Sequence, residues 1–221
     1  GVFDIIYNPA RTALLLQAEQ LGIPCAGGLS MLVAQAKRSA ELFTGTEIAD
    51  GRVAEIERAV RARLENIVII GMPGCGKSSV ARRLGERLGR EVVECDAYLE
   101  QQAGKTIPEI FAEGGETAFR RLETEALREL GKRSGIILST GGGCVTRSEN
   151  YPLLHQNGTI FWLLRSPWKL PSDGRPLSQA ESAEAMYARR EPMYRRFVDV
   201  KIDNEGAIER AVEAIARKVL L

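Results

Sequence analysis

A glycine-rich octapeptide constrains this fold more than any other part of the sequence. Residues 71–78 read GMPGCGKS and match the pattern G-x-x-x-x-G-K-[ST]. A β-branched run, Ile67–Ile70, precedes them, and a helix-like stretch begins at Lys77. Glycines let backbone N–H groups converge on an anion, and the following helix points its positive end at the same place. The sequence therefore predicts a nucleotide-binding P-loop, with Lys77 reaching the β- and γ-phosphates and Ser78 ligating Mg²⁺.

The sequence from residue 66 onward alternates between strand and helix patterns, which predicts an α/β fold with a parallel sheet covered on both faces. The expected strands are 67–70, 91–94, 136–139, 159–164 and 198–202. The expected helices are 77–88, 98–102, 107–112, 116–133, one from about 182 that Pro192 interrupts, and 207–220. Residues 166–180 are rich in Pro, Ser, Asp and Gly and are predicted to form a mobile loop.

The first 65 residues differ from the rest. They predict one strand, 2–7, helices at 11–20 and 29–42, and a linker helix at about 52–65 whose apolar side chains recur at helical spacing. One strand and three helices bury too little surface for a robust core of their own.

Composition limits the class of protein. Thirty Lys and Arg against 29 Asp and Glu give a net charge of +1, so neither nucleic acid nor a membrane surface is an expected partner. The four cysteines are scattered, which favours reduced thiols and a cytoplasmic location. The single histidine, His155, excludes a multi-histidine metal site, and its place at a helix end favours a structural role.

Four further patterns are candidates for a second binding pocket. Glu94 and Asp96 follow a strand and would share one face if it continued, although Asp96 is equally explained as a helix N-cap. Arg120 and Glu123 are an i, i+3 pair of the kind that usually lies in solvent. Three glycines, Gly141, Gly142 and Gly143, follow another strand and either admit a substrate against bare backbone or form a plain turn.

Arginines mark the fourth pattern. Arg175 lies in the predicted loop, where an arginine that closes over phosphates is a recurring device in phosphoryl transfer. Arg190 is a candidate for a bidentate contact to a carboxylate, with Arg189, Arg195 and Arg196 as close competitors.

Together and in this order, these motifs resemble the shikimate kinase family over residues 66–221. The resemblance implies a five-stranded, nucleoside-monophosphate-kinase-like fold with a lid at about 166–180, ATP as co-substrate and Mg²⁺ as cofactor. It implies catalytic roles for Lys77, Asp96 and Arg175. It implies that shikimate is bound by Asp96, Arg120, Gly141, Gly142, Gly143 and Arg190, and ATP by Gly74, Cys75, Gly76, Lys77, Ser78, Ser79 and Arg175.

Two departures from the family pattern stand out. Glu94 takes the place of a usual aspartate near the magnesium shell, so Ser78 is the expected direct ligand and Glu94 reaches the ion through water. The predicted lid at 166–180 is also shorter than in many members of the family, which bears on the contacts between the protein and the adenine of ATP.

Residues 1–65 resemble the C-terminal end of shikimate dehydrogenase, through DIIYNP at 4–9, GLSMLVAQA at 28–36 and FTG at 43–45. The dinucleotide loop and the catalytic Lys and Asp of that family are absent. The expectation is a fragment of a bifunctional fusion without dehydrogenase activity, whose kinase part is monomeric.

The expected reaction is phosphorylation of the shikimate 3-hydroxyl by ATP, in the synthesis of aromatic amino acids, with lid closure excluding water. Two alternatives stay open. One is a kinase for another small acid or alcohol, such as gluconate, or for a nucleoside monophosphate. The other is a nucleotide-binding module without turnover.

Overall fold

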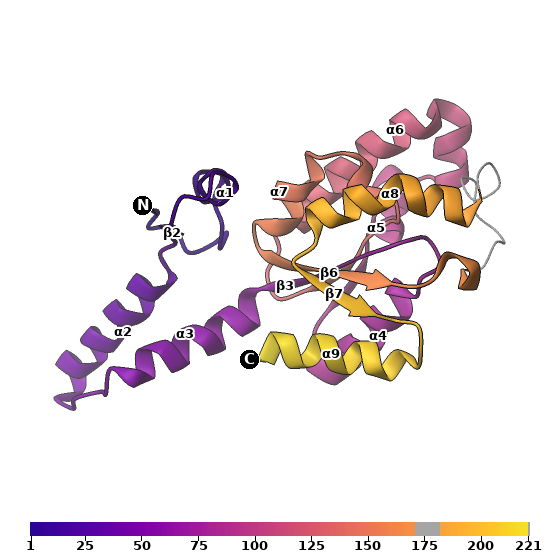
Figure 1. The fold of residues 1–221 in the computed structure, drawn as a ribbon. Coiled ribbons are helices and arrows are strands. Elements are labelled where there is room, and N and C mark those ends of the chain that lie inside the picture. The colour runs from indigo at the N-terminus through magenta and orange to yellow at the C-terminus, as the bar shows by residue number, and fades with distance from the viewer. Residues whose placement is uncertain (171–181, 221) are drawn as a thin grey trace.

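A five-stranded parallel sheet forms the centre of the molecule (Figure 1). The computed structural model describes residues 1–170 and 182–220. The strands are β3 (Asn66–Ile70), β4 (Val92–Glu94), β5 (Ile137–Ser139), β6 (Gly158–Leu164) and β7 (Val200–Asp203), in the spatial order β4-β5-β3-β6-β7. All five residues of β3 are buried, as expected of a central strand with both faces covered. The predicted α/β class is confirmed.

Helices cover both faces of this sheet (Figure 1). Helices α4 (Lys77–Leu88) and α9 (Ile208–Leu220) pack together on one face. The other face carries α6 (Ile107–Leu130), α7 (Asn150–His155) and α8 (Ala183–Phe197), and α5 (Cys95–Ala103) packs on α6. Two short 3₁₀ turns, η1 (Cys144–Thr146) and η2 (Pro167–Lys169), follow β5 and β6. Because every strand runs in the same direction, the loops at their carboxyl ends meet at one edge of the sheet.

Several element boundaries differ from the sequence expectation. The predicted break at Pro192 is wrong, because α8 runs through this residue from Ala183 to Phe197. Proline removes one helix hydrogen bond and its ring crowds the carbonyl four residues earlier, but the contacts of Arg190 and Tyr194 with Gly142 hold the helix on both sides of it. The predicted helices at 107–112 and 116–133 form one element, α6, that is bent at Gly115, where φ is +65°.

The first 65 residues form a separate, smaller unit that extends away from the sheet and its helices (Figure 1). The three expected helices are present as α1 (Ala13–Gln20), α2 (Leu29–Thr44) and α3 (Gly51–Leu64). The expected strand 2–7 is too long: β1 covers Val2–Phe3 and pairs in parallel with β2 (Cys25–Ala26), which sequence patterning missed. Strands of two residues leave no alternation of polar and apolar side chains to detect.

This N-terminal segment buries few apolar side chains. Only Leu15, Leu16, Ala18 and Val33 belong to its buried core. Among the described residues, Trp168 is the one large exposed apolar side chain outside this segment, and those inside it are Phe3, Ile5, Ile6, Tyr7, Leu14, Leu21, Ile23, Met31, Leu32, Leu42, Phe43 and Ile56. The expectation that 1–65 cannot build a robust core agrees with this distribution.

Backbone contacts fasten the N-terminal segment to the end of α7. The Arg11 amide donates to the carbonyl of Gln156 at 2.8 Å, and the Ala10 amide donates to Asn157 Oδ1 at 2.7 Å. His155 ends α7, as predicted, and lies buried with Nδ1 3.2 Å from Asp199 Oδ2 and Nε2 3.5 Å from Glu19 Oε2. Its ring stacks on Tyr151 at 4.9 Å, so its role is structural, at the junction of the two parts. In the described part of the chain, no helix is both long and apolar enough to cross a bilayer.

Candidate active site

The octapeptide that follows β3 folds as a phosphate-binding loop. Gly74 and Gly76 adopt φ values of +81° and +97°, which a residue with a Cβ rarely reaches. Gly76 caps α4, so the first amides of the helix point into the loop. The Lys77 ammonium group is buried and donates to the carbonyls of Gly71 at 2.9 Å and Met72 at 3.0 Å. Two backbone carbonyls of the loop therefore satisfy the Lys77 ammonium group.

Asn204 fixes the loop from the far end of the sequence. Its Nδ2 donates to the Cys75 carbonyl at 2.7 Å, and its backbone amide donates to Leu164 at 2.9 Å. A Cβ built on Gly76 would lie 3.0 Å from the same Nδ2. The chain after β7 thus sets the position of the phosphate loop. Glycine at position 76 allows the Asn204 side chain to approach the loop closely.

A hydroxyl and a carboxylate meet where the helix begins. Ser78 Oγ donates to Glu94 Oε2 at 2.7 Å, and Ser139 Oγ lies 3.5 Å from Ser78 Oγ. A hydroxyl beside a carboxylate is the oxygen donor set that Mg²⁺ prefers, and Mg²⁺ keeps its remaining positions for water and phosphate oxygens. In residues 1–170 and 182–220, no group of three His, Cys, Asp or Glu side chains is arranged for a metal.

A cavity of about 320 Å³ opens beside the phosphate loop. Its polar wall includes Lys77, Ser78, Glu94, Asp96, Arg120, Glu123, Ser139, Thr140 and Arg190. Its apolar wall includes Pro73, Ile107, Pro108, Phe111 and Phe119. Such a volume suits a small polar molecule rather than a nucleotide. The glycines Gly141, Gly142 and Gly143 form part of the lining.

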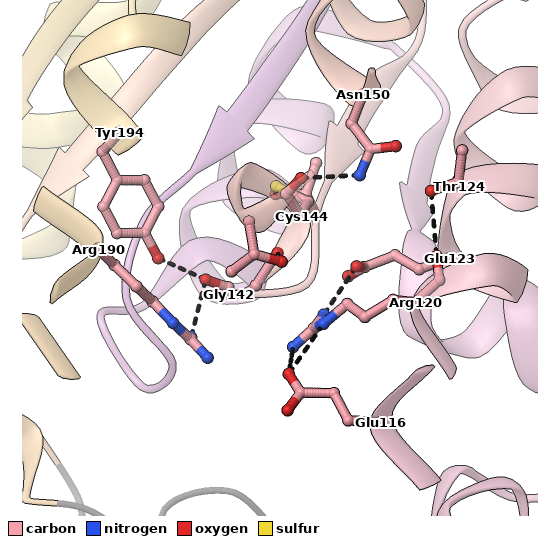
Figure 2. A network of polar contacts seen from close by, with 12 residues as sticks. Glu116, Arg120, Glu123, Thr124, Gly142, Cys144, Asn150, Arg190 and Tyr194 are labelled. Atoms are coloured by element: carbon pink, nitrogen blue, oxygen red, sulfur yellow. Dashed lines mark hydrogen bonds and ion pairs between the residues drawn. The ribbon is translucent and has the colours of Figure 1, made fainter. Parts of the chain in front are cut away.

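Arg120 is held in this cavity by two glutamates (Figure 2). Its Nη1 donates to Glu123 Oε2 at 2.7 Å, and Glu116 Oε1 lies 3.2 Å from its Nε and Nη2. Glu123 is fully buried and Arg120 is 7% exposed, so the expectation of a solvated surface pair is wrong. Burial raises the pKa of the Glu123 carboxyl, and the Arg120 guanidinium opposes that rise. The pair fixes the direction of the guanidinium toward the glycine loop.

Arg190 approaches the glycine loop from α8 (Figure 2). Its Nη1 donates to the Gly142 carbonyl at 3.1 Å, and the Tyr194 hydroxyl donates to the same oxygen at 2.5 Å. Arg190 is 2% exposed, and its Nε has no hydrogen-bond partner. A buried guanidinium that is only partly satisfied favours an anionic ligand.

Behind the same loop, two polar contacts fix the backbone. Asn150 Nδ2 donates to the Cys144 carbonyl at 2.7 Å, and Cys144 Sγ donates to Thr140 Oγ1 at 3.3 Å. Burial raises the pKa of the Cys144 thiol to about 12, so it stays protonated.

Asp96 and Glu94 do not share a strand face, contrary to the sequence expectation. Strand β4 ends at Glu94, and Asp96 lies in the first turn of α5. The N-cap of α5 is Glu94, so the N-cap interpretation of Asp96 is also wrong. A Cβ built on Gly141 would lie 3.0 Å from Asp96 Oδ1 and 2.6 Å from Glu123 Oε1. Only a glycine at 141 lets both carboxylates approach the loop.

The structure brings most of the predicted residues into one site. Those that line the cavity are Gly74, Lys77, Ser78, Glu94, Asp96, Arg120, Gly141, Gly142, Gly143 and Arg190. Cys75, Gly76 and Ser79 belong to the loop and to α4 rather than to the cavity wall, and the Cys75 side chain is fully buried. Arg175 and most of the predicted lid at 166–180 lie outside the described residues; within the described part, 167–169 form η2. Of the competing arginines, Arg195 and Arg196 are exposed outside the cavity.

Sequence reasoning missed several contributors to this site. Ser139, Thr140, Phe111 and Asn204 carry no local motif, and only their position near the carboxyl ends of strands or on the flanking helices hints at a role. The aromatic wall is the clearest omission, because Phe111 and Phe119 stack at 4.8 Å across the bend of α6. Their spacing along the sequence looks like ordinary core packing.

Comparison with known proteins agrees with this geometry. The model of the shikimate kinase family matches residues 73–220. The shikimate kinase of Prochlorococcus marinus (strain MIT 9313) is 41% identical over 139 residues, which span 58% of this chain and 72% of that protein. The shikimate kinase of Acinetobacter baumannii (strain AYE) is 37% identical over 168 residues, which span 71% and 93%.

Solved structures give the same result. A shikimate kinase from Acinetobacter baumannii in complex with shikimate has a TM-score of 0.64 to this chain at 31% identity, and covers 74% of this chain and 97% of its own. The enzyme from Aquifex aeolicus has a TM-score of 0.62 at 28% identity, with 70% and 95% covered. Since the family match includes residues 73–78 of the phosphate loop, Asp96 and both cavity arginines, this chain belongs to the shikimate kinase family.

Proposed function

We propose that this chain transfers the γ-phosphoryl group of ATP to the 3-hydroxyl of shikimate, in a cavity that holds the acid by its carboxylate. The observation that carries this assignment is the placement of Arg120 and Arg190 in the same cavity as Lys77 and Asp96. The guanidinium groups of Arg120 and Arg190 suit a carboxylate on the ligand. The Asp96 carboxylate suits the hydroxyl groups on the ring of the ligand. Guanidinium groups also bind the phosphate of a nucleoside monophosphate, so the substrate assay described below includes one.

The phosphate loop places the donor. Lys77 exchanges its bonds to the Gly71 and Met72 carbonyls for oxygens of the β- and γ-phosphates, and the amides at the start of α4 bind the anion. Ser78 would hold Mg²⁺ directly and Glu94 would hold it through water, and the ion would supply charge neutralisation of the phosphates. The fit rests on the hydroxyl–carboxylate contact at 2.7 Å.

The acceptor is held on the other side of the cavity. Arg120 and Arg190 bind the shikimate carboxylate, and Phe111 and Phe119 contact the ring. Asp96 binds the ring hydroxyls and accepts the proton of the attacking one. The bare backbone at Gly141, Gly142 and Gly143 leaves the space that the ring needs. Catalysis then comes mainly from positioning and from neutralised charge, to which Arg175 contributes.

A coupled assay for ADP tests the reaction. Purified protein with ATP and Mg²⁺ is offered shikimate, gluconate and a nucleoside monophosphate in turn, and turnover is expected with shikimate alone. Arg120→Ala should raise the shikimate KM by a factor that corresponds to about 2–5 kcal/mol. Arg121→Ala is the matched control, because its side chain is exposed and outside the cavity. Equal turnover on gluconate, or an unchanged shikimate KM in Arg120→Ala, would contradict the assignment.

We further propose that residues 1–65 are the C-terminal remnant of a dehydrogenase domain, and that residues 66–221 are the kinase domain of a fused parent protein. Twelve large apolar side chains on the first 65 residues are exposed, with Phe43 at 91% and Phe3 at 85%, which supports a missing covering domain. The chain should bind an apolar dye on this surface and show no reduction of either nicotinamide dinucleotide with shikimate. Measurable dehydrogenase turnover would contradict the proposal that residues 1–65 are a remnant of a dehydrogenase domain.

The cellular setting is part of the same proposal. All four cysteines are free, and three of them are buried, which supports a reducing cytoplasm. The kinase part is proposed to act as a monomer, because its own large apolar side chains other than Trp168 are covered in the described part of residues 66–220.

A further inference from the structure

Arg165 lies beside the phosphate loop and does not line the acceptor cavity. Arg165 follows directly after β6, the strand that pairs with β3 along its whole length. Both strands end at the same edge of the sheet, so Arg165 and the phosphate loop are neighbours there. A Cβ built on Gly76 would lie 4.0 Å from Arg165 Nη1, which places the guanidinium next to the residue before Lys77.

This guanidinium has no partner in the chain as described. Across residues 1–170 and 182–220, Arg165 takes part in no hydrogen bond or ion pair, and its Nε is buried without an acceptor. Only one other described arginine, Arg190, has a buried Nε without a partner, and it faces the acceptor cavity. Leaving a buried donor unsatisfied costs free energy, which an anionic ligand recovers.

The position of Arg165 indicates which part of the nucleotide its side chain contacts. The γ-phosphoryl group must face Asp96 and the acceptor cavity, and neither Arg165 nor Gly76 lines that cavity. The side of the loop next to Gly76 therefore faces the part of the nucleotide that remains as ADP. On that side the structure offers the Asn204 amide group, already bonded to Cys75, and the Arg165 guanidinium.

We propose that Arg165 binds the α- and β-phosphates of the nucleotide and is a further nucleotide-binding residue of this enzyme. This inference rests on the proposed function for the identity of the ligand. Lys77 neutralises the phosphates from within the loop, and Arg165 neutralises them from the neighbouring strand end. Charge develops on the β-phosphate as the β–γ bond breaks, so the same contact stabilises the leaving group.

Calorimetric titration with ADP and Mg²⁺ tests this contact without any turnover. Arg165→Met keeps an unbranched apolar stem and removes the charge, and it should weaken ADP binding by on the order of ten- to a hundred-fold. Arg165→Lys should recover part of the affinity. The affinity for shikimate should stay within twofold of the wild type in both variants, because Arg165 does not reach the acceptor cavity.

Arg195→Ala is the matched control, since Arg195 is exposed on α8 and pairs with Glu191. It should leave ADP binding unchanged. ADP binding within twofold of wild type in Arg165→Met would overturn the inference, and so would an equal loss of ADP and shikimate affinity, which would mean a structural role. If the wild-type protein binds ADP but does not phosphorylate shikimate, the proposed function fails while the ADP titration still decides the role of Arg165.

Discussion

A single added methyl group at Gly143 should separate acceptor binding from nucleotide binding. A Cβ at this position would lie 2.1 Å from Arg120 Nη2, 2.4 Å from Cζ and 2.5 Å from Nη1. The backbone of Gly143, with φ −107° and ψ 3°, is open to alanine. The strain of Gly143→Ala therefore falls on the Arg120 guanidinium, the flexible end of a long side chain, and the fold is expected to survive.

The size of the effect follows from the displacement. Ordinary contact with a Cβ begins at 3.4 Å, so Arg120 Nη2 must move by more than about 1 Å, away from the position that its 2.7 Å bond to Glu123 defines. A misplacement of about 1 Å in a positioning group costs on the order of 100-fold in rate. For Gly143→Ala we expect a loss of this order in kcat/KM for shikimate, about 2.7 kcal/mol. The KM for ATP should stay within twofold, because the three atoms nearest to the added methyl all belong to Arg120.

Steady-state kinetics with each substrate varied in turn measure this loss. Gly51→Ala is the control, since a Cβ there meets no atom within 4 Å. Gly142→Ala gives a contrasting result, because its Cβ would lie 2.6 Å from Pro73 Cδ in the phosphate loop, so the ATP KM should rise as well. In an Arg120→Ala background, Gly143→Ala should have no further effect. Wild-type kinetics for shikimate in Gly143→Ala would refute the role given to the Arg120 guanidinium.

Two further substitutions test side chains that hold the site and its surroundings in place. Tyr194→Phe removes the hydroxyl that donates to Gly142 at 2.5 Å and should lower the free energy of unfolding by about 0.5–1.5 kcal/mol, measured by urea denaturation; no change would show that the bond adds nothing. Hydrogen bonds from Lys169 and Ser166 lower the pKa of Glu205 from 4.5 to about 2. A lowered carboxyl pKa stabilises the fold above pH 4.5, and this contribution is lost as the pH falls toward 2. The difference in Tm between wild type and Glu205→Gln should therefore be present at pH 7 and shrink across that range, and a constant difference would contradict it.

The fold and the phosphate loop were predictable because their signals are local. The run Ile67–Ile70 and the octapeptide after it specify a strand, a turn and a helix start within a few residues, and all three lie where expected. The same holds for the triple glycine, whose place at the end of β5 follows from the strand before it.

Features that depend on residues far apart in the sequence were harder to predict from the sequence. The burial of the Arg120–Glu123 pair comes from the way α6 packs on the sheet, and an i, i+3 spacing reads the same in solvent and in a cavity. Asp96 lies in a helix rather than on a continued strand because α5 begins at Cys95, three residues before the predicted helix at 98–102. Arg165 has no motif at all, and only the pairing of β6 with β3 reveals its neighbour.

The bond from Asn204 to Cys75 has a consequence for the making of this protein. The two residues are 129 positions apart, and the second becomes available only when the last strand has been synthesised. On the ribosome, the phosphate loop is therefore translated in its complete form long before its backbone is held in place. A nascent chain released before codon 204 would carry the whole nucleotide motif and still lack the amide that makes it rigid, so nucleotide affinity should arise late, with the closing edge of the sheet.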